Sequence, residues 1–547
     1  MPDSLPIWDL TDLYIDSSAS IQLDLDTAKQ QTEKLVQHEG RLSQMTGAEL
    51  AAVIAEYQSV SERLSRIISH ADLQFAADMA DPQTGQHAQG MKEAISGFSS
   101  QLMFIELELA AMDEDGFQQA LSDPDFYHFL PWLRRLRAFA PHQLETRLEQ
   151  MLVERTPAGR GAWIRLFDET ATALRFAFQG TEVTEAEILN KLSEPSADIR
   201  KEAGQSLSKV MQDNQRLFCL ILNVIAKDKE IDDRWRGFNR PVSSRNLAND
   251  VDDATVDALA GAVTARMPDI AHRYYQLKAG WMGADELPWW DRNAPLPGDD
   301  DRRFNWSDAR QIVTDAFAGF DQPMADVAQQ FFDRNWIDAE VRKGKASGAF
   351  SHPTVPSAHP YILMNFDGRA RDVMTLAHEM GHGIHQVLAA DKGYLMSDTP
   401  LTLAETASVF AEMLAFQTLV DKAPNDAARR FLLAGKVEDM LNTVVRQIAF
   451  HNFETAFHDA RKSGEVSAEA LSDLWMQTQT QALGPAVRLD DSYRPIWAYI
   501  PHFVHTPFYV YAYAFGDCLV NALWQNYQVK SAGEKLVFSE QYIQLLK

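Results

Sequence analysis

The segment "LAHEMGHGIHQ", Leu376–Gln386, places metal-binding side chains at helical spacing. His378 and His382 are four residues apart, so in a helix both imidazoles project from one face, one turn apart. At this spacing two ring nitrogens can bind one ion at about 2.0 to 2.1 Å, the usual distance for zinc. Glu379 lies between them and is displaced around the helix, where its carboxylate can hydrogen-bond a metal-bound water. The pattern therefore predicts a metal site with a general base beside it.

A catalytic zinc ion needs a third protein ligand and an open coordination position. Downstream, the helical segment "LAETASVFAEMLAF" carries Glu405 and Glu412, seven residues apart on nearly the same face. Both lie among apolar residues, where an unpaired carboxylate would be costly. One of them can bind the metal while the other orients a ligand histidine, and we favour Glu405 as the ligand. The alternatives are surface histidines on an ordinary helix and, for Glu412, a salt-bridged helix residue.

Gly381 and Gly383 lie inside the first segment, although each glycine in a helix costs about 0.5 to 1 kcal/mol relative to alanine. We expect them to remove side chains where a second backbone or a substrate approaches, with metal binding offsetting their cost. His385 follows His382 by about one turn and faces the same side. It is expected either to hydrogen-bond a ligand residue or simply to pack.

Most of the chain that positions these residues is predicted to be helical. Apolar residues recur at three- and four-residue intervals, as in amphipathic helices, over residues 46–78, 84–112 and 142–178. A break is expected at "FQGTEVT", residues 178–184. Residues 344–367 are the one convincing extended region, with "YILMNF" as a short apolar strand, and helix returns from Asp372.

The composition is that of an ordinary globular protein, because 46% of the 547 residues are hydrophobic and 23% are charged. The formal net charge of -26 argues against a nucleic-acid partner, since such binding relies on clustered Lys and Arg. No apolar stretch reaches the roughly 18 residues of a membrane span, and the start, "MPDSLPIWDLTDLY", has no signal-peptide pattern. We therefore expect a cytoplasmic protein that binds neither nucleic acid nor membrane.

A second polar group lies near the C-terminus, in "IPHFVHTPFYVYAYAFG", residues 500–516. Tyr509 and Tyr513 are one helical turn apart, so two phenol donors can point to one place. Hydrolysis of an amide places negative charge on the former carbonyl oxygen, where a preorganised donor contributes about 2.7 to 4 kcal/mol. The alternative is that these aromatic residues belong to the hydrophobic core.

The extended region offers a backbone edge shortly before the predicted metal helix. Gly348, Ala349 and Phe350 are expected to form a strand edge to which a peptide adds as a further strand through its own main chain. The alternative is a hairpin that only packs against the helices.

"HEMGH", followed downstream by "ETASVFAE", resembles the zinc site of the thimet oligopeptidase group, and specifically of its oligoendopeptidase F branch. Other segments resemble signatures of the same family: "WDLTDLY", "WIDAEVRKGKASGAF", "HPYILMNFDG" and "PHFVHTPFYVYAYAFG". The resemblance spans nearly the whole chain. It implies a mainly α fold, a large helical zinc-peptidase fold with a deep substrate channel, and we expect one small β-sheet near the active site. It also implies a C-terminal segment beyond "YIQLLK", with which this sequence stops.

Within this fold we expect an N-terminal helical domain, residues 1–180, that forms one wall of the channel, and a zinc-peptidase catalytic domain, residues 181–547. The resemblance also implies roles at the metal site. His378, His382 and Glu405 match the family's ligands for one zinc ion per chain, and Glu379 matches its general base.

In this family a histidine and a tyrosine from the C-terminal aromatic segment donate to the oxyanion and to the peptide backbone. His502, Tyr509 and Tyr513 are the matching choices in this sequence. His505 and Tyr511 are the alternatives, as further substrate contacts, because the two alignments differ by only a few residues.

These roles predict a zinc endopeptidase that cuts internal bonds of short unstructured peptides. Glu379 would take a proton from the attacking water and pass it to the leaving amine. Histidine and carboxylate ligands also accept cobalt or manganese.

Two rival hypotheses are a helical zinc carboxypeptidase, which trims single C-terminal residues, and a catalytically silent peptide-binding protein. The sequence assigns no oligomeric state.

Overall fold

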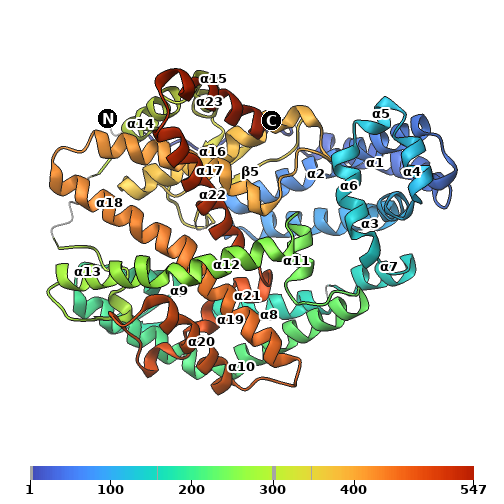
Figure 1. Cartoon of the computed structure of the whole chain (residues 1–547). Coiled ribbons are helices and arrows are strands. Elements are labelled where there is room, and N and C mark those ends of the chain that lie inside the picture. Colours follow the sequence, from blue (N-terminus) through green and yellow to red (C-terminus); the bar gives the residue numbers. More distant parts are fainter. Residues whose placement is uncertain (1–3, 16, 157, 298–302, 347) are drawn as a thin grey trace. The chain divides into compact units, whose positions relative to one another are not determined.

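The computed structural model describes residues 4–15, 17–156, 158–297, 303–346 and 348–547. The chain forms two compact units, each assembled from separate stretches of sequence. The first comprises Met1–Thr146, Asp301–Lys422 and Leu519–Lys547, and the second comprises Arg147–Asp300 and Ala423–Cys518. Figure 1 follows the chain through them in the colours of the sequence.

The N-terminal part of the first unit is a group of helices around one hydrophobic core. It contains α1 (Ser17–Leu35), α2 (Gly47–Ala77), α3 (Pro82–Ala111), α4 (Glu114–Ala120), α5 (Pro124–Tyr127) and α6 (Leu130–Phe139), drawn in blue and cyan in Figure 1. A capping box starts α2, because the Thr46 hydroxyl accepts the backbone N–H of Glu49 and the Glu49 carboxylate accepts that of Thr46. Leu50, Ile54 and Phe126 are fully buried in this core.

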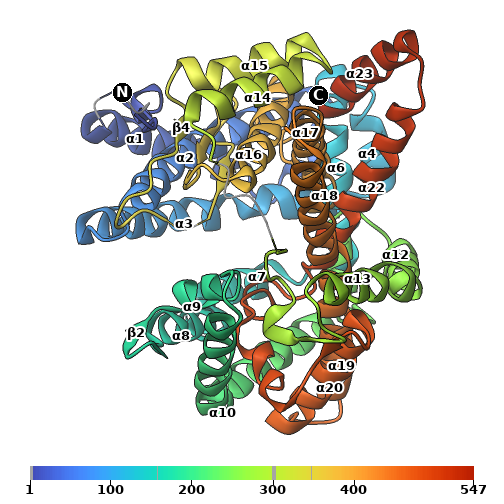
Figure 2. The same ribbon diagram turned by 90° about the vertical axis from the view of Figure 1, so that its left-hand side faces the viewer.

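The centre of the first unit combines a small sheet with helices packed around it. Its elements are α14 (Trp306–Ala318), α15 (Gln322–Asp333), β4 (Ile337–Asp338), β5 (Phe350–His352), β6 (Tyr361–Leu363), α16 (Ala370–Ala389), α17 (Leu401–Asp421) and, near the C-terminus, α23 (Ala532–Leu546). The strand order is β4-β6-β5, with buried β6 in the middle, parallel to β4 and antiparallel to β5. α16 packs against α17 and against β5, and Figure 2 shows α14 to α17 grouped together.

Among the described residues, α17 is the one helix that is long and apolar enough to pass a composition test for a membrane span. In this fold, 67% of its apolar window is buried. The helix packs along α14 and α16, so core packing accounts for its apolar composition.

The second unit is organised around the long helix α10 (Ala197–Trp235). Its other helices are α7 (Thr146–Arg155), α8 (Arg160–Ala173), α9 (Glu185–Lys191), α11 (Ser243–Ala248), α12 (Asp253–Met267), α13 (Arg273–Trp281), α18 (Asp426–Met440), α19 (Arg446–Arg461), α20 (Ala468–Leu483), α21 (His502–His505) and the start of α22 (Tyr511–Gln528). Two strand pairs accompany them: β1 (Phe176–Phe178) with β2 (Thr181–Val183), and β3 (Leu287–Pro288) with β7 (Val487–Arg488). Buried aromatic rings fill the core, and the Phe453 ring lies 5.5 Å from Trp475 and 5.1 Å from Phe503.

The structure confirms the mainly α fold and the small sheet beside the motif helix, but it differs from the sequence predictions in detail. Residues 142–178 form α7, α8 and β1 rather than one helix. Gln179 and Gly180 adopt φ values of 50° and 77°, which make the two-residue turn of the β1-β2 hairpin. Neither this hairpin nor the β3-β7 pair was predicted.

The compact units also differ from the predicted division at residue 180. Residues 1–146 share a unit with α16 and α17, whereas residues 147–300 belong to the other unit. Local patterns do not reveal this division, because each unit is assembled from segments that are distant along the chain.

Candidate metal centre

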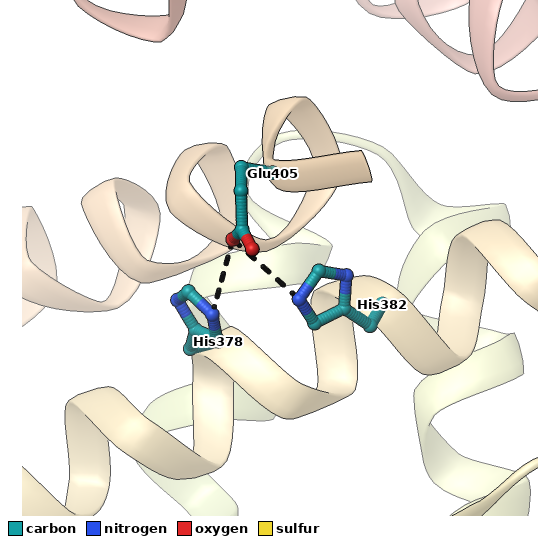
Figure 3. A group of neighbouring side chains, drawn as sticks. All are labelled: His378, His382 and Glu405. Atoms are coloured by element: carbon teal, nitrogen blue, oxygen red, sulfur yellow. Dashed lines mark ion pairs between the residues drawn. The ribbon is translucent and has the colours of Figure 1, made fainter. Parts of the chain in front are cut away.

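Two helices of the first unit bring together the residues singled out for metal binding. α16 carries His378 and His382, α17 carries Glu405, and Figure 3 shows the carboxylate pointing towards both imidazoles. The start of α16 is defined by Asp372, whose carboxylate accepts the backbone N–H of Arg369 at 2.9 Å. From this start, the helical repeat places the two histidines on one face.

The three donor atoms have the spacing of a metal site. Glu405 Oε2 lies 3.4 Å from His378 Nε2 and 3.6 Å from His382 Nε2, and the three ligand atoms all lie within 4.8 Å of one another. Ligands at about 2.0 to 2.1 Å from a tetrahedral zinc ion are about 3.3 to 3.4 Å apart. Two imidazoles and one carboxylate are also a donor set that catalytic zinc uses. These residues therefore fit a divalent cation.

The close crossing of α16 and α17 depends on Gly381. A Cβ added at Gly381 would lie 2.6 Å from the Ala407 carbonyl oxygen and 2.7 Å from Ser408 Cα, closer than van der Waals contact permits. At Gly383 an added Cβ would instead lie 2.6 Å from Cζ of the Phe331 ring on α15. The structure confirms the predicted approach of a second backbone at Gly381, whereas at Gly383 the neighbour is an aromatic side chain rather than the predicted backbone or substrate.

Partners behind the ligands orient them. Glu412 Oε2 lies 3.3 Å from His378 Nδ1, so it can accept that ring N–H and leave Nε2 for a metal. The Ser408 hydroxyl donates to Glu405 Oε2 at 2.7 Å. The geometry of Glu412 agrees with its predicted orienting role. Ser408 was not predicted, although its position three residues after Glu405 puts both on one side of the helix.

In the absence of a metal ion, burial and the neighbouring carboxylates shift the pKa values of the two histidines in opposite directions. Burial alone lowers the pKa of His378, but the Glu405 and Glu412 carboxylates outweigh burial and raise it to about 10. Burial alone raises the pKa of Glu405, but hydrogen bonding and charge from His378 lower it to about 2. Burial lowers the pKa of His382 to about 4, which keeps this imidazole in the neutral form that binds metals.

His385 lies beside this ligand set and has a partner of its own. Its Nε2 is 3.5 Å from the Thr399 hydroxyl oxygen, and burial lowers its pKa. This geometry favours packing with a hydrogen bond to Thr399 over the predicted alternative, a hydrogen bond to a ligand residue.

Glu379 is 7% exposed and lies on the same helix as the two histidines. Burial raises the pKa of its carboxyl to about 7, although the charge of His378 and a hydrogen bond from the Ser351 backbone N–H oppose the rise. Ser351 belongs to β5, so the sheet holds this carboxyl in place, a contact that the sequence pattern did not predict. A carboxyl with a pKa near neutrality is suited to accepting and releasing a proton.

β5 is an edge strand of the sheet that packs on α16. β6 lies on one side of it, and among the described residues no strand lies on the other. Gly348 is exposed with φ of +81°, and its carbonyl accepts a hydrogen bond from Asn365 Nδ2 at 3.1 Å. Ala349 and Phe350 are half-buried. The three predicted residues therefore form an accessible backbone segment that is held from one side.

In the second unit, His502, Tyr509 and Tyr513 form a group that we call the His–Tyr cluster. His502 Nε2 lies 3.3 Å from the Tyr513 hydroxyl, and the Tyr509 ring centroid lies 4.9 Å from that of Tyr513 and 5.9 Å from that of His502. All three side chains are half-buried. Burial lowers the pKa of His502, which keeps its imidazole neutral.

The two alternative residues of this segment are engaged elsewhere. His505 Nε2 lies 2.6 Å from Asp168 Oδ1 on α8. Tyr511 is fully buried, and its hydroxyl accepts a hydrogen bond from Asn249 Nδ2 at 2.9 Å. A fully buried ring cannot meet a substrate, so this geometry does not support the predicted substrate contact of Tyr511.

Similar proteins are found by sequence and by structure. A family model described as Peptidase family M3 matches residues 314–545, and one described as Oligopeptidase F matches residues 108–176. The Group B oligopeptidase PepB of Streptococcus agalactiae is 25% identical over 94% of this chain and 86% of its own length. Oligopeptidase PepF of Bacillus subtilis is 24% identical over 99% of this chain and 81% of its own. Oligoendopeptidase-F from Enterococcus faecium matches in structure with a TM-score of 0.72 and 19% identity, over 97% of this chain and 91% of that one, which establishes the shared fold.

Proposed function

Because this chain belongs to peptidase family M3, within its oligoendopeptidase F group, we propose that it is a zinc-dependent endopeptidase of short unstructured peptides. Peptidase activity follows from the family, and the proposal adds the metal, the internal cut and the class of substrate. The observation that carries it is the spacing at the metal centre, where the two histidine Nε2 atoms lie 3.4 and 3.6 Å from Glu405 Oε2. Glu379 is buried on the same helix.

In the proposed mechanism, His378, His382 and Glu405 hold one zinc ion. Bound zinc would supply a Lewis acid for the scissile carbonyl and for the attacking water. The Glu379 carboxylate takes a proton from that water and passes it to the leaving amine. Glu412 keeps the proton of His378 on Nδ1, so that Nε2 is presented as a ligand atom.

We propose that the peptide binds along β5, with Gly348, Ala349 and Phe350 pairing with its main chain. The edge position of β5 and the exposure of Gly348 support this role. A crystal structure with a peptide analogue is expected to show main-chain hydrogen bonds to this stretch. An analogue bound without any such bond would assign β5 a packing role only.

We propose that the His–Tyr cluster donates hydrogen bonds to the developing oxyanion and to the peptide backbone. Replacement of Tyr513 by phenylalanine is expected to lower kcat about a hundredfold, because one such donor contributes about 2.7 to 4 kcal/mol. Steady-state kinetics and zinc analysis check this, and zinc content should stay unchanged. Tyr57→Phe is the matched control, since it makes the same chemical change at a hydroxyl that donates to Glu106 on α3. Unchanged turnover in Tyr513→Phe would remove Tyr513 from the reaction.

Mass spectrometry of a blocked decapeptide incubated with the protein, with and without a chelator, tests the proposed function. We expect internal cleavage that stops when the metal is removed and returns when zinc is added. Removal of single C-terminal residues from an unblocked peptide, with no cut in the blocked one, would favour the carboxypeptidase. Absence of any cleavage by zinc-containing protein would favour the silent peptide-binding protein.

A further inference from the structure

The loop that carries Tyr509 contains a turn in a strained conformation. Between α21 and α22, the Tyr509 N–H donates to the Thr506 carbonyl at 3.1 Å, and Phe508 has φ of +62°. This hydrogen bond, a proline at the second position (Pro507) and a positive φ at the third are features of a type II turn. The third position normally takes glycine or asparagine, because a Cβ crowds the backbone there. Phe508 keeps this conformation only if its surroundings impose it.

One face of α19 provides these surroundings. His451, Glu454 and His458 follow one another at three- and four-residue intervals, so they share a face of the helix. The Phe508 ring centroid lies 6.0 Å from that of His451 and 4.8 Å from that of His458. Between them, Glu454 Oε1 accepts the Phe508 backbone N–H at 2.8 Å. Phe508 is 1% exposed, so water cannot replace this acceptor.

Burying a carboxyl at position 454 destabilises the fold unless its hydrogen bond with the turn offsets that cost. Glu454 is 1% exposed, and its Oε2 is buried without a hydrogen-bond partner among the described residues. Burial raises the pKa of Glu454 to about 8, although the Phe508 N–H and the charges of Arg245 and Lys229 oppose the rise. An apolar side chain of similar length would fill the same space without an unsatisfied oxygen. The hydrogen bond to Phe508 is therefore the feature that distinguishes glutamate here from a packing residue.

Other elements anchor the loop on both sides of this turn. Arg160 on α8 donates to the His505 carbonyl at 2.8 Å, before the turn. Asn249, after α11, donates to the Tyr511 hydroxyl at 2.9 Å, beyond it. Between these two contacts, Glu454 accepts the backbone N–H of Phe508, the residue directly before Tyr509.

We propose that Glu454 is a positioning residue for peptide cleavage, which holds the strained turn at Phe508 and thereby fixes Tyr509 within the His–Tyr cluster. This inference rests on the proposed function, because that function assigns the cluster to the reacting peptide. A donor displaced by about 1 Å can lower a rate about a hundredfold. Glu454 therefore influences turnover without touching the substrate.

The test compares two substitutions in the zinc-loaded full chain, with a blocked decapeptide as substrate. Glu454→Met removes the acceptor but keeps an unbranched side chain, and Glu454→Gln retains an oxygen that can accept the Phe508 N–H. We expect Glu454→Met to lower kcat about ten- to a hundredfold with KM changed less than about threefold. Glu454→Gln should recover most of the lost turnover.

Trp475→Phe is the matched control for a perturbed core, since Trp475 is 1% exposed on α20. Its ring contacts are Phe450, Phe453 and Tyr493, none of which lies in the turn. Amide hydrogen exchange over residues 506–513 adds a readout that does not depend on activity. Exchange there should be faster in Glu454→Met than in the wild type, Glu454→Gln or Trp475→Phe.

The outcomes separate this inference from the proposed function. If the zinc-loaded wild type does not cleave the peptide, the proposed function fails. If the wild type is active but Glu454→Met has a kcat no lower than that of Trp475→Phe, the positioning role alone is overturned. Unchanged exchange over residues 506–513 in Glu454→Met would also overturn it.

Discussion

Replacement of Glu379 by glutamine is expected to abolish peptide cleavage while leaving the metal bound. Glutamine keeps the shape of the side chain, but its amide cannot accept the proton of the attacking water. General base catalysis contributes about a hundred- to ten-thousandfold, so we expect kcat/KM to fall at least about a thousandfold. Zinc analysis of the same sample should show one ion per chain, because the proposed ligands are the other three residues.

The burial of Glu379 makes the effect of this substitution easy to interpret. Glu379 is 7% exposed, and Ser351 donates its backbone N–H to the carboxyl, so the side chain is held in one place. Asp391→Asn is a suitable control, because it makes the same chemical change on an exposed residue just after α16. Activity of Glu379→Gln within tenfold of this control would show that another group is the base.

Replacement of Gly381 by alanine is expected to damage both the fold and the metal site. The added Cβ would lie 2.6 Å from the Ala407 carbonyl oxygen and 2.8 Å from the Ala411 Cβ, so α16 and α17 must move apart. Overpacking of this kind typically costs about 1 to 3 kcal/mol, and here two of the three nearest atoms belong to the backbone of α17, which cannot rotate away. Glu405 lies two residues before Ala407, so the same shift displaces a ligand. We expect about ten- to a hundredfold weaker zinc binding.

Chelator competition and thermal unfolding of the metal-free protein measure the two effects separately. Gly435→Ala is the matched control, because Gly435 lies in the interior of α18 with nothing within 4 Å of an added Cβ. Its substitution should be neutral or stabilise the protein by up to about 1 kcal/mol, since alanine favours helix. If Gly381→Ala unfolds and binds zinc like Gly435→Ala, the helix crossing is looser than the structure indicates.

Much of the helical fold is predictable from local patterns. The amphipathic repeat over residues 46–78 matches α2, and the short apolar strand in "YILMNF" matches β6. These elements follow from side-chain periodicity, which a sequence displays directly. The prediction of one helix over residues 142–178 is wrong, because α7 ends at Arg155, α8 begins at Arg160 and Phe176–Phe178 form β1. Gln179 and Gly180, both with positive φ, then make the turn of the β1-β2 hairpin. The break predicted at residues 178–184 is confirmed, since this turn lies within it.

The partners of the candidate site are less predictable than its ligands. Ser351 and Glu454 each contact a residue far away in the sequence, and neither belongs to a recognisable motif. Tyr511 has the same residue type as Tyr509 and Tyr513 and lies two residues from each, and it is buried while they are half-buried. Which tyrosine faces outward is decided by where the turn at Phe508 ends and α22 begins.

The sequence by itself determined the types of the ligands and their spacing on each helix, because the four-residue interval of His378 and His382 defines a common face in any helix. The tertiary structure alone decided that Glu405 meets both histidines, how closely α16 and α17 cross at Gly381, and which stretches of chain form each compact unit. These features depend on contacts between segments that are distant along the chain. Their free energies arise from packing and burial in the assembled fold, which local periodicity does not encode.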